Sequence, residues 1–371
     1  SEIRDSVDAR RAINLAWMPT QAPAFLRKLW SRPDLLAQAN RKAGTPLSVE
    51  DLSLLYRAQD EPLTISDIPL IDELEELLGT LDLASAQKRR AEEQREKEER
   101  ERANEALKAT GLGGGIVTAD MLMRQTQEAP SLRPLAERAR ADRSWTYGHI
   151  VIDEAQDLSP MAWRCLLRRC PSRSMTVVGD LDQKRGHRRP NSWKQALGPA
   201  ARAFSEEFVL SISYRTPRTL TRIAQAVMAQ HGTPVLYPME AVRDVPDCYQ
   251  VSHTQKDTLK ECVSQVVSTM EERLDREEGE GKGRICVIVP DAQAQLWHAD
   301  ESGASALDQR VSYLTAAGSK GLEFDSVVVV EPGAILDQGS GDLFVALTRA
   351  THDLHAVTTT QLPRGMEERD A

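Results

Sequence analysis

Aromatic residues are scarce in this sequence, at 5% of its 371 residues. An excess of positive charge is also missing, because 47 Lys and Arg residues stand against 56 Asp and Glu residues, for a net charge of −9. A site built on a row of stacked rings would therefore be small, and a chain whose main task is to coat phosphates or a membrane surface is disfavoured. No apolar run approaches the roughly 20 residues that span a bilayer, so we expect no membrane contact.

The cysteines are few and show no metal-binding or redox pattern. No two of them have the Cys-x-x-Cys spacing of a zinc site or a redox pair. We therefore expect reduced, mostly buried thiols in a cytoplasmic protein. The five are Cys165, Cys170, Cys248, Cys262 and Cys286.

The first 147 residues are predicted to be mainly helical. Segments such as APAFLRKLW, VEDLSLLYRA and ISDIPLIDELEELLGTL place apolar residues at helical spacing. Residues 58–87 contain acidic side chains and no basic ones, and residues 86–108 are almost entirely charged. We expect the latter to form a solvated helical arm, supported by Glu-to-base pairs four residues apart, and GLGGG at 111–115 to form a hinge or loop.

From residue 148 onwards, short runs rich in Val and Ile alternate with amphipathic segments. The runs are HIVID, MTVVGD, EFVLSIS, RICVIVP, SVVVVEP and LHAVTT. Buried strands that alternate with helices predict an α/β fold with parallel sheets and flanking helices.

Carboxylates follow two of the predicted strands. HIVID runs into Asp153 and Glu154, and MTVVGD runs into Asp180 and Gln183. Ligands bind at the carboxyl edge of a parallel sheet, where an Asp can hold Mg²⁺ and a neighbouring Glu can deprotonate an attacking water. Gln183 could contact a terminal phosphate or that water. The alternative is a set of exposed carboxylates at strand ends with no further role.

Two arginines lie where an anion partner is needed. Arg215 follows a predicted strand, and Arg349 lies among apolar residues in FVALTRATHDL. A buried Arg requires phosphate or carboxylate, so both predict an anion site, with salt bridges inside a domain as the alternative. A Gly-Ser-Lys-Gly turn, which contains Lys320 and Gly321, and then Glu323 precede another buried strand.

In this order DEAQD, GDLDQ, SYR, GSKGLEFD and VALTRAT resemble motifs II to VI of superfamily 1 helicases related to UvrD and Rep. The sequence around DEAQD and GDLDQ resembles that of the actinobacterial HelD group, which are helicase-like factors that bind bacterial RNA polymerase. The resemblance implies RecA-like motor domains: a helical insertion at 1–147, the C-terminal part of the first motor domain at 148–215, and the second at 216–371.

The resemblance also implies a role for each matching residue, with ATP and Mg²⁺ as cofactors. Asp153 would ligate the Mg²⁺ of Mg-ATP, Glu154 would activate the water, and Gln183 would couple the γ-phosphate to motion. The carboxylate of Asp180 belongs to the same edge. Arg215 and Arg349 would reach the γ-phosphate from the opposite wall, with Arg349 as an arginine finger. Glu323 would bind the ribose, and Lys320 or the backbone near Gly321 would lie close to the cleft or the polynucleotide.

The sequence departs from the family in its phosphate loop. It contains no Gly-x-x-x-x-Gly-Lys-Ser/Thr, so it offers no Lys for the β- and γ-phosphates. We expect this chain alone to be inactive and to be the C-terminal fragment of a longer protein, with natural loss of the loop as the alternative.

A second departure follows Gln183, where UvrD-type helicases usually have an aromatic residue that stacks on a DNA base. Here KRGHRRPNSWKQALG is basic, with Trp193 as its one ring. Without stacking rings a strand-unwinding motor is less well supported, although a basic loop can grip DNA phosphates in a salt-dependent way.

Three functions remain in competition. The first is a HelD-like, ATP-dependent translocase that remodels or recycles RNA polymerase, favoured by the missing rings and the acidic 58–87 stretch. The second is a UvrD-like helicase that acts on single-stranded DNA in repair or recombination. The third, for this chain alone, is a non-catalytic binding scaffold.

Overall fold

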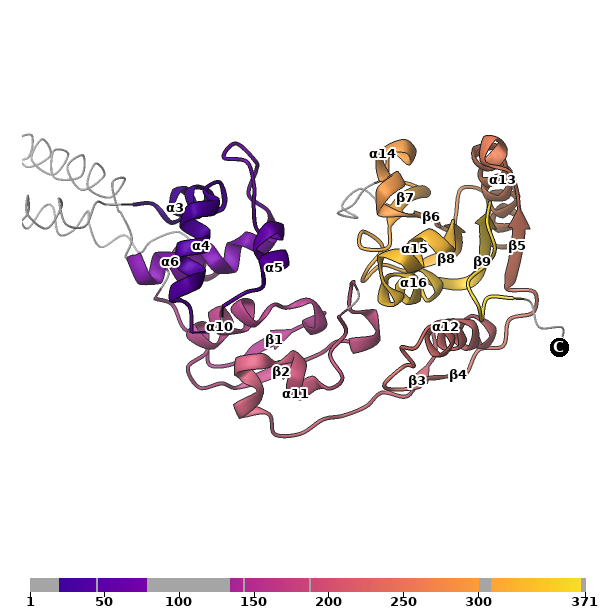
Figure 1. The fold of residues 1–371 in the computed structure, drawn as a ribbon. Coiled ribbons are helices and arrows are strands. Elements are labelled where there is room, and N and C mark those ends of the chain that lie inside the picture. The colour runs from indigo at the N-terminus through magenta and orange to yellow at the C-terminus, as the bar shows by residue number, and fades with distance from the viewer. Residues whose placement is uncertain are drawn as a thin grey trace, which may run out of the picture. The chain divides into compact units, whose positions relative to one another are not determined.

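The computed structural model describes residues 20–44, 46–78, 134–142, 144–186, 188–299 and 308–367. The chain divides into two compact units, Ser1–Thr146 and Tyr147–Ala371, whose elements are labelled in Figure 1. The predicted charged arm at 86–108 and the GLGGG segment at 111–115 lie outside the described residues. The three predicted domains stay a prediction.

The described part of the first unit is helical. Its elements are α3 (Ala22–Trp30), α4 (Pro33–Lys42), α5 (Val49–Leu54), the 3-10 turn η1 (Ile65–Asp67), α6 (Ile68–Leu78) and α9 (Leu135–Ala141). Helices therefore lie where apolar periodicity predicted them. Ala22, Leu26 and Trp30 recur every fourth residue, so they form one buried face of α3, and this helix contacts both α4 and α6.

A buried carboxylate ties the helices of the first unit together. Asp67 is 2% exposed and closes a capping box in which its Oδ2 accepts the backbone N–H of Thr64 at 2.7 Å. The same oxygen lies 2.8 Å from Nη1 of Arg57. Arg57 in turn places its guanidinium 4.3 Å from the ring centroid of Trp30. One acidic side chain thus connects the start of α6 to the end of α3.

The second unit begins with a strand, a helix and a second strand. β1 (Ile150–Ile152) pairs in parallel with β2 (Met175–Val177), and α10 (Pro160–Arg169) connects them. Trp163 of α10 is fully buried and packs with Ile152 and Ala155. The 3-10 turns η2 (Ala155–Asp157) and η3 (Leu181–Gln183) follow the two strands, and α11 (Trp193–Ala196) and η4 (Gly198–Ala203) come next.

A second parallel pair lies further along the chain. β3 (Ile212–Ser213) pairs with β4 (Glu240–Ala241), and α12 (Arg218–Gln230) connects them. The prediction of a buried strand over all of EFVLSIS is wrong in its first part, because only two of its residues are in a strand. Phe208 and Leu210 are 80% and 87% exposed, since no described strand or helix covers them.

A five-stranded parallel sheet forms the core of the second unit. Its order is β5-β9-β8-β6-β7, with β5 (Tyr249–His253), β6 (Ile285–Val289), β7 (Val311–Thr315), β8 (Phe324–Val330) and β9 (Ala350–Thr358). The turn η5 (Lys256–Thr258) and α13 (Leu259–Glu277) lie between β5 and β6, and η6 (Asp291–Gln293) and α14 (Ala294–Trp297) follow β6. α15 (Pro332–Gln338) and α16 (Ser340–Leu347) connect β8 to β9.

Helices cover both faces of this sheet. Along β6, Cys286 and Ile288 pack in a cluster with residues of α12 and α16, whereas Val287 and Val289 pack in another cluster with α13. Alternate side chains of a strand point to opposite faces, so this division places helices on both sides. The predicted α/β fold with parallel sheets and flanking helices is confirmed.

Strands β5 and β7 are the edges of this sheet, and neither was predicted from the sequence. Their sequences, YQVSH and VSYLT, mix apolar and polar residues, unlike the continuous Val and Ile runs of the central strands. An edge strand has one paired side only, so it needs less apolar surface and gives a weaker signal. The central runs RICVIVP, SVVVVEP and LHAVTT correspond to β6, β8 and β9.

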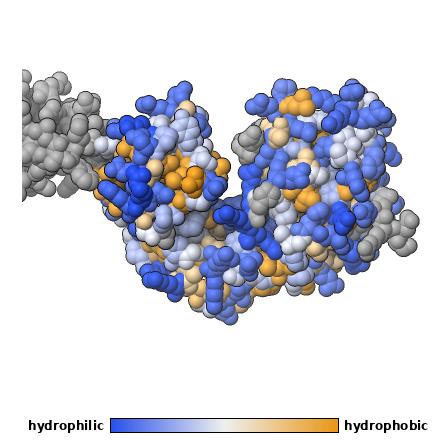
Figure 2. Space-filling model, viewed as in Figure 1, coloured by the Kyte–Doolittle hydropathy of each residue, from blue (hydrophilic) through white to orange (hydrophobic). Residues whose placement is uncertain are grey.

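The surface in Figure 2 is mostly hydrophilic, with apolar patches between charged residues. Exposed apolar side chains include Val49, Leu54 and Ile65 in the first unit. In the described ranges, no helix combines the length and apolarity that crossing a membrane requires. Among the cysteines, Cys170, Cys248 and Cys286 are buried, and burial raises the pKa of the Cys248 and Cys286 thiols.

We predict that Asp67→Asn destabilises the first unit by about 2 kcal/mol, because a buried, charged acceptor loses its ionic contacts. The pKa of Asp67 is lowered: burial alone would raise it, but the hydrogen bonds from Thr64 and Arg57 together outweigh burial. A carboxylate whose pKa is lower in the folded state than in the unfolded state stabilises the fold at pH values above its unfolded-state pKa of about 4. This stabilisation is lost as the pH falls through the pKa of the folded state. Hydrogen exchange of α3 and α6 in the full chain measures both effects.

Wild type and Asp67→Asn should therefore differ in protection at pH 7 and converge at low pH, after correction for the intrinsic exchange rate. Asp34→Asn is the matched control, because Asp34 is also paired to an Arg, at 2.7 Å from Arg32, but its side chain is 61% exposed. Equal losses of protection in the two variants would contradict the anchoring role of Asp67.

Candidate nucleotide-binding site

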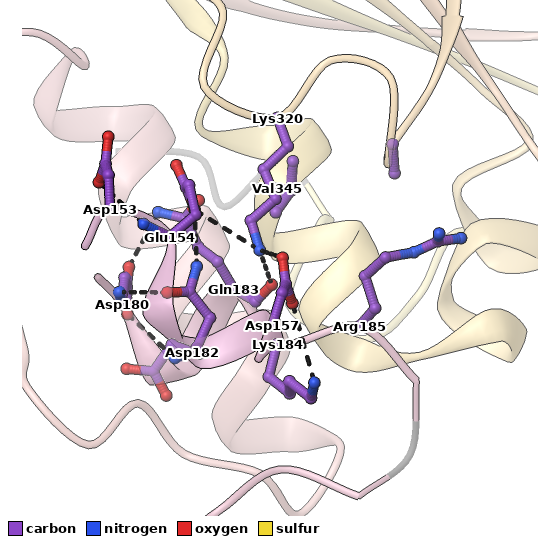
Figure 3. Close-up of polar contacts among 12 residues, drawn as sticks. Asp153, Glu154, Asp157, Asp180, Asp182, Gln183, Lys184, Arg185, Lys320 and Val345 are labelled. Atoms are coloured by element: carbon purple, nitrogen blue, oxygen red, sulfur yellow. Dashed lines mark hydrogen bonds and ion pairs between the residues drawn. The ribbon is translucent and has the colours of Figure 1, made fainter. Parts of the chain in front are cut away.

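The two predicted carboxylate-bearing strand ends lie together. Ile152 of β1 is the register partner of Val177 of β2, so the residues that follow these strands emerge at the same edge. Figure 3 shows Asp153 and Glu154 beside Asp180 and Gln183 at this edge. The structure therefore brings these four predicted residues together, and their roles stay a prediction.

Glu154 has an unusual backbone and well-defined side-chain partners. Its φ of 51° is in the left-handed region, which non-glycine residues seldom adopt. Its backbone N–H donates to Oδ1 of Asp153 at 2.8 Å. Oε2 of Glu154 accepts from Nε2 of Gln156 at 2.7 Å and lies 3.6 Å from Nζ of Lys320. Gly321 comes close as well, since a Cβ there would lie 3.8 Å from Oε1 of Glu154.

Gln156 joins the two strand ends, and the sequence analysis assigned it no role. Its side chain is 2% exposed. Oε1 of Gln156 accepts the backbone N–H of Asp180 at 3.1 Å, while its Nε2 donates to Glu154. Gly179 leaves the room for this contact, because a Cβ at that position would lie 2.3 Å from Oε1 of Gln156. Nothing local in DEAQD indicates this role, because the partner of Gln156, the backbone N–H of Asp180, lies 24 residues further along the chain.

Asp180 organises the turn after β2. Its Oδ1 accepts the backbone N–H of Asp182 at 2.9 Å, and its Oδ2 accepts from Nε2 of Gln183 at 3.0 Å. This is the arrangement of an N-cap residue, and it fixes the position of the Gln183 side chain. Gln183 is thereby held with its carbonyl oxygen towards Arg349, whose Nη2 donates to it at 3.3 Å.

Arg349 is buried, as its apolar surroundings predicted, with an exposure of 2%. Besides Gln183, its guanidinium donates to the backbone oxygens of Val345 and Leu322, at 3.2 Å and 3.4 Å, and to Oγ1 of Thr348. Burial, and next the nearby charge of Arg215, lower the pKa of Arg349 to about 10, so it stays protonated at neutral pH. Within the described chain, no carboxylate lies within ion-pair distance of this buried cation.

The remaining predicted residues lie on the same side of the second unit. Nη1 of Arg215 donates to Oε1 of Glu323 at 2.6 Å, with both side chains partly exposed. Nζ of Lys320 donates to Oδ2 of Asp157 at 2.5 Å and to the backbone oxygen of Gln183 at 3.0 Å (Figure 3). The structure thus connects the loop before β8 to the segments after β1 and β2. The sequence analysis did not identify Asp157 as a partner.

The basic segment after Gln183 is largely engaged within the chain. Nζ of Lys184 lies 3.9 Å from Oδ1 of Asp157. Arg185 lies 3.2 Å from Asp342 and 2.8 Å from Asp291. The prediction of a basic loop that grips phosphates did not anticipate these carboxylates, which lie up to 157 residues away in sequence.

Further along this segment, Arg189 forms an ion pair with buried Asp182, which also accepts the backbone N–H of Leu236 at 2.9 Å. Burial, and next the Asp180 carboxylate, raise the pKa of Asp182, and its hydrogen bonds and Arg189 offset this only in part. Trp193 packs beside Gly179, where a Cβ would lie 3.0 Å from its ring. The one ring of this segment therefore packs against the β2 turn.

The donor atoms at this edge fit a magnesium-bound nucleotide. Mg²⁺ prefers carboxylate oxygens together with water, and Asp153 presents an exposed carboxylate next to Asp180. The cations Lys320, Arg215 and Arg349 provide the positive charge that phosphates require. A cavity of about 490 Å³ lies elsewhere, between α13 and strands β5 and β9, and none of these residues lines it.

Comparison with known proteins identifies a helicase-type segment. Residues 61–184, about a third of the chain, match the family described as the UvrD/REP helicase N-terminal domain. This segment contains both DEAQD and GDLDQ. The match supports the UvrD and Rep part of the resemblance and does not extend to the HelD group. No curated protein matches the sequence.

Several solved structures show remote likeness. The C-terminal domain of a possible DNA helicase from Lactobacillus plantarum WCFS1 is 17% identical, with a TM-score of 0.28, over 42% of this chain and 92% of that one. Arterivirus nonstructural protein 10, a helicase, is 15% identical, with a TM-score of 0.32, over 57% of this chain and 39% of that one. Its complex with DNA gives 17% identity and a TM-score of 0.32. At this level the likeness carries no conclusion about function.

We predict that Gly179→Ala lowers stability by roughly 1–3 kcal/mol, because the new Cβ would overlap Oε1 of Gln156 and also approach the backbone N of Ala155. Gly148→Ala is the matched control, since no atom lies within 4 Å of a Cβ at that position. Thermal unfolding of the two variants of the full chain measures the difference. Equal melting temperatures would show that the Gly179 turn is not tightly packed.

Proposed function

We propose that this chain carries part of the ATP-hydrolysing motor of a superfamily 1 helicase or translocase related to UvrD and Rep. The main support is the buried, protonated guanidinium of Arg349, which has backbone and amide acceptors but no carboxylate partner in the described part of the chain. Such a cation favours an anion with several oxygens, and it lies beside Gln183 at the edge that carries Asp153 and Glu154. The match of residues 61–184 to a helicase family points to the same function.

The chain's own residues fit distinct tasks at this site. Asp153 would hold Mg²⁺, which supplies charge neutralisation to the phosphates when bound. Gln156 and Lys320 engage Oε2 of Glu154, so Oε1 is the oxygen that takes a proton from the attacking water. Gln183 orients towards Arg349, Arg215 adds a second cation, and these arginines stabilise the charge of the transferring phosphoryl group. Glu323 would bind the ribose, and Lys320 holds the two parts of the site together.

Two substitutions test this proposal in the complete polypeptide, that is, this chain with any residues that precede it. Glu154→Gln should lower kcat for ATP hydrolysis by 10²- to 10⁴-fold while nucleotide affinity is retained, because only the proton acceptor is lost. Arg349→Ala should lower kcat by about 10³-fold or more, because a transition-state cation is lost. Steady-state ATPase kinetics and nucleotide titration measure both.

The matched controls are Glu240→Gln and Arg218→Ala, which alter an exposed β4 carboxylate and an arginine paired with Asp244. Both should hydrolyse ATP at the wild-type rate. ATP hydrolysis by the Glu154→Gln variant at the wild-type rate would contradict the assignment of Glu154 as the general base. The sequence predicts that this chain alone does not turn over ATP, so turnover by it would mean that another segment replaces the phosphate loop.

For the substrate of the motor, we propose remodelling or recycling of RNA polymerase, with a single-stranded DNA helicase as the second candidate. The packing of Trp193 at the β2 turn and the ion pairs of Lys184 and Arg185 favour the first candidate, because they occupy the groups that a base-stacking, phosphate-gripping loop would use. The acidic stretch at 58–87 suits a basic partner surface. A non-catalytic scaffold is a third role, for this chain by itself.

Two binding experiments separate the first two candidates. The polypeptide should co-elute with bacterial RNA polymerase, and deletion of residues 58–110 should weaken this complex, because the acidic stretch is lost. Its binding to fluorescent oligo-dT should be weak and fall steeply with salt. Tight, length-dependent binding to oligo-dT that survives moderate salt, without polymerase binding, would instead establish the DNA helicase.

A further inference from the structure

We propose that Gln156 is a positioning residue that connects Glu154 to the Gln183 turn, and that it completes a directional chain of hydrogen bonds from Arg349 to Glu154. The inference rests on the proposed function for its catalytic consequence, but the chain of contacts stands on geometry alone. Gln156 is one of few fully buried polar side chains at this edge, with an exposure of 2%.

Four hydrogen bonds link Arg349 to Glu154 from residue to residue. Nη2 of Arg349 donates to Oε1 of Gln183 at 3.3 Å, and Nε2 of Gln183 donates to Oδ2 of Asp180 at 3.0 Å. The backbone N–H of Asp180 then donates to Oε1 of Gln156 at 3.1 Å, and Nε2 of Gln156 donates to Oε2 of Glu154 at 2.7 Å. Every link therefore points in the same direction.

Elementary hydrogen-bonding chemistry fixes that direction. A guanidinium can only donate, and an ionised carboxylate can only accept. The backbone N–H of Asp180 can only donate as well, so the carbonyl end of Gln156 must face it and the amide NH₂ must face Glu154. Reversing the Gln156 amide would leave two donors facing each other at one end and two acceptors at the other, in a buried position.

Two consequences follow for Glu154. First, its carboxylate is held by a donor that cannot rotate away, because the other end of the same amide is bound to the β2 turn. Second, a change at Arg349 or Gln183 reaches Glu154 through movement of Asp180, whose side chain accepts from Gln183 and whose backbone N–H donates to Gln156. An anion that draws Arg349 towards itself would thus shift the Gln183 turn and, through Gln156, the base. Gln156 would couple the sensing of the phosphate to the positioning of the proton acceptor.

The bridge can be tested on this chain directly by NMR of glutamine side-chain amides labelled with ¹⁵N. The Gln156 signal is assigned by its absence in Gln156→Ala. It should move in Glu154→Ala, because the carboxylate that accepts from its N–H is lost, and it should stay in place in the matched variant Glu240→Gln, which alters an exposed carboxylate of β4. The Gln225 amide is the internal control, since it donates to the backbone oxygen of Met239 at 2.8 Å. A Gln156 signal that stays in place in Glu154→Ala, or that moves equally in Glu240→Gln, would overturn the bridge.

The catalytic consequence is tested in the complete polypeptide with Gln156→Glu. This variant replaces the donor with a second carboxylate, which repels Glu154 and removes the hydrogen bond that fixes its Oε2. We expect kcat to fall by on the order of 10² with KM for ATP little changed, because the proton acceptor is displaced while the nucleotide contacts remain. Gln225→Glu should leave both kinetic constants at their wild-type values.

The two levels of the proposal fail separately. A wild type without ATPase activity whose Gln156 signal moves in Glu154→Ala would contradict the proposed function and support the bridge. An active wild type in which Gln156→Glu folds normally and keeps the wild-type kcat would support the proposed function and overturn the role of Gln156. A merely structural Gln156 would lower the melting temperature of Gln156→Glu without lowering kcat relative to KM.

Discussion

The buried guanidinium of Arg349 is the constraint on which the site depends. A charged side chain that is 2% exposed cannot be solvated by bulk water, so its N–H groups must find acceptors within the fold. Those acceptors are the backbone oxygens of Val345 in α16 and Leu322 before β8, and the side chain of Gln183 after β2. Satisfying one side chain therefore fixes three segments that are far apart in sequence.

Close backbone packing strengthens the same connection. A Cβ at Gly341 would lie 2.0 Å from the backbone oxygen of Lys184, and one at Gly339 would lie 2.9 Å from the backbone of Gly186. Asp342, next in the chain, is buried and accepts from both Arg185 and the Gly186 N–H. The start of α16 thus contacts the segment after β2 with no side chain between the two backbones. Any motion of the Gln183 turn is consequently tied to the helix that leads to Arg349.

The sequence predicted those parts of the fold and site that depend on local pattern. The continuous Val and Ile runs of β6 and β8 identified buried parallel strands, and the carboxylates after β1 and β2 had to share an edge once the sheet was parallel. The edge strands β5 and β7 were missed because they need only half of that apolar signal. The exposed residues 208–211 were wrongly placed in a strand, because apolar composition alone cannot show whether other elements cover a segment.

Long-range polar contacts could not be predicted from the sequence, for a different reason. Nothing local in KRGHRRP distinguishes a basic side chain that meets phosphate from one that meets Asp342 or Asp182, since these carboxylates come from segments brought near by folding. The same holds for Lys320 and Asp157, which are 163 residues apart. The importance of Gln156 also follows only from the reversal of the chain after β1, which brings its amide to the Asp180 N–H.

The left-handed backbone of Glu154 shows how local strain and function are related here. Such a conformation costs about 1–3 kcal/mol in a residue with a side chain and persists only where the surroundings hold it. Glu331, at the end of β8, has the same kind of backbone, with a φ of 49°. Its carboxylate is 6% exposed and accepts from Thr358 and from the Thr359 N–H, so both of its oxygens are used inside the fold.

Glu154 differs from Glu331 in what its carboxylate does. Its side chain is 40% exposed, and only Oε2 has hydrogen-bond or ion-pair partners in the described chain, namely Gln156 and Lys320. A strained backbone alone therefore does not mark a functional residue, because Glu331 has the same kind of backbone and both of its carboxylate oxygens are bonded inside the fold. The combination of a strained backbone, one oxygen with partners and one oxygen without is what suits a residue for proton transfer. The Glu154 carboxylate lies at the edge where Asp153 and Asp180 also lie (Figure 3).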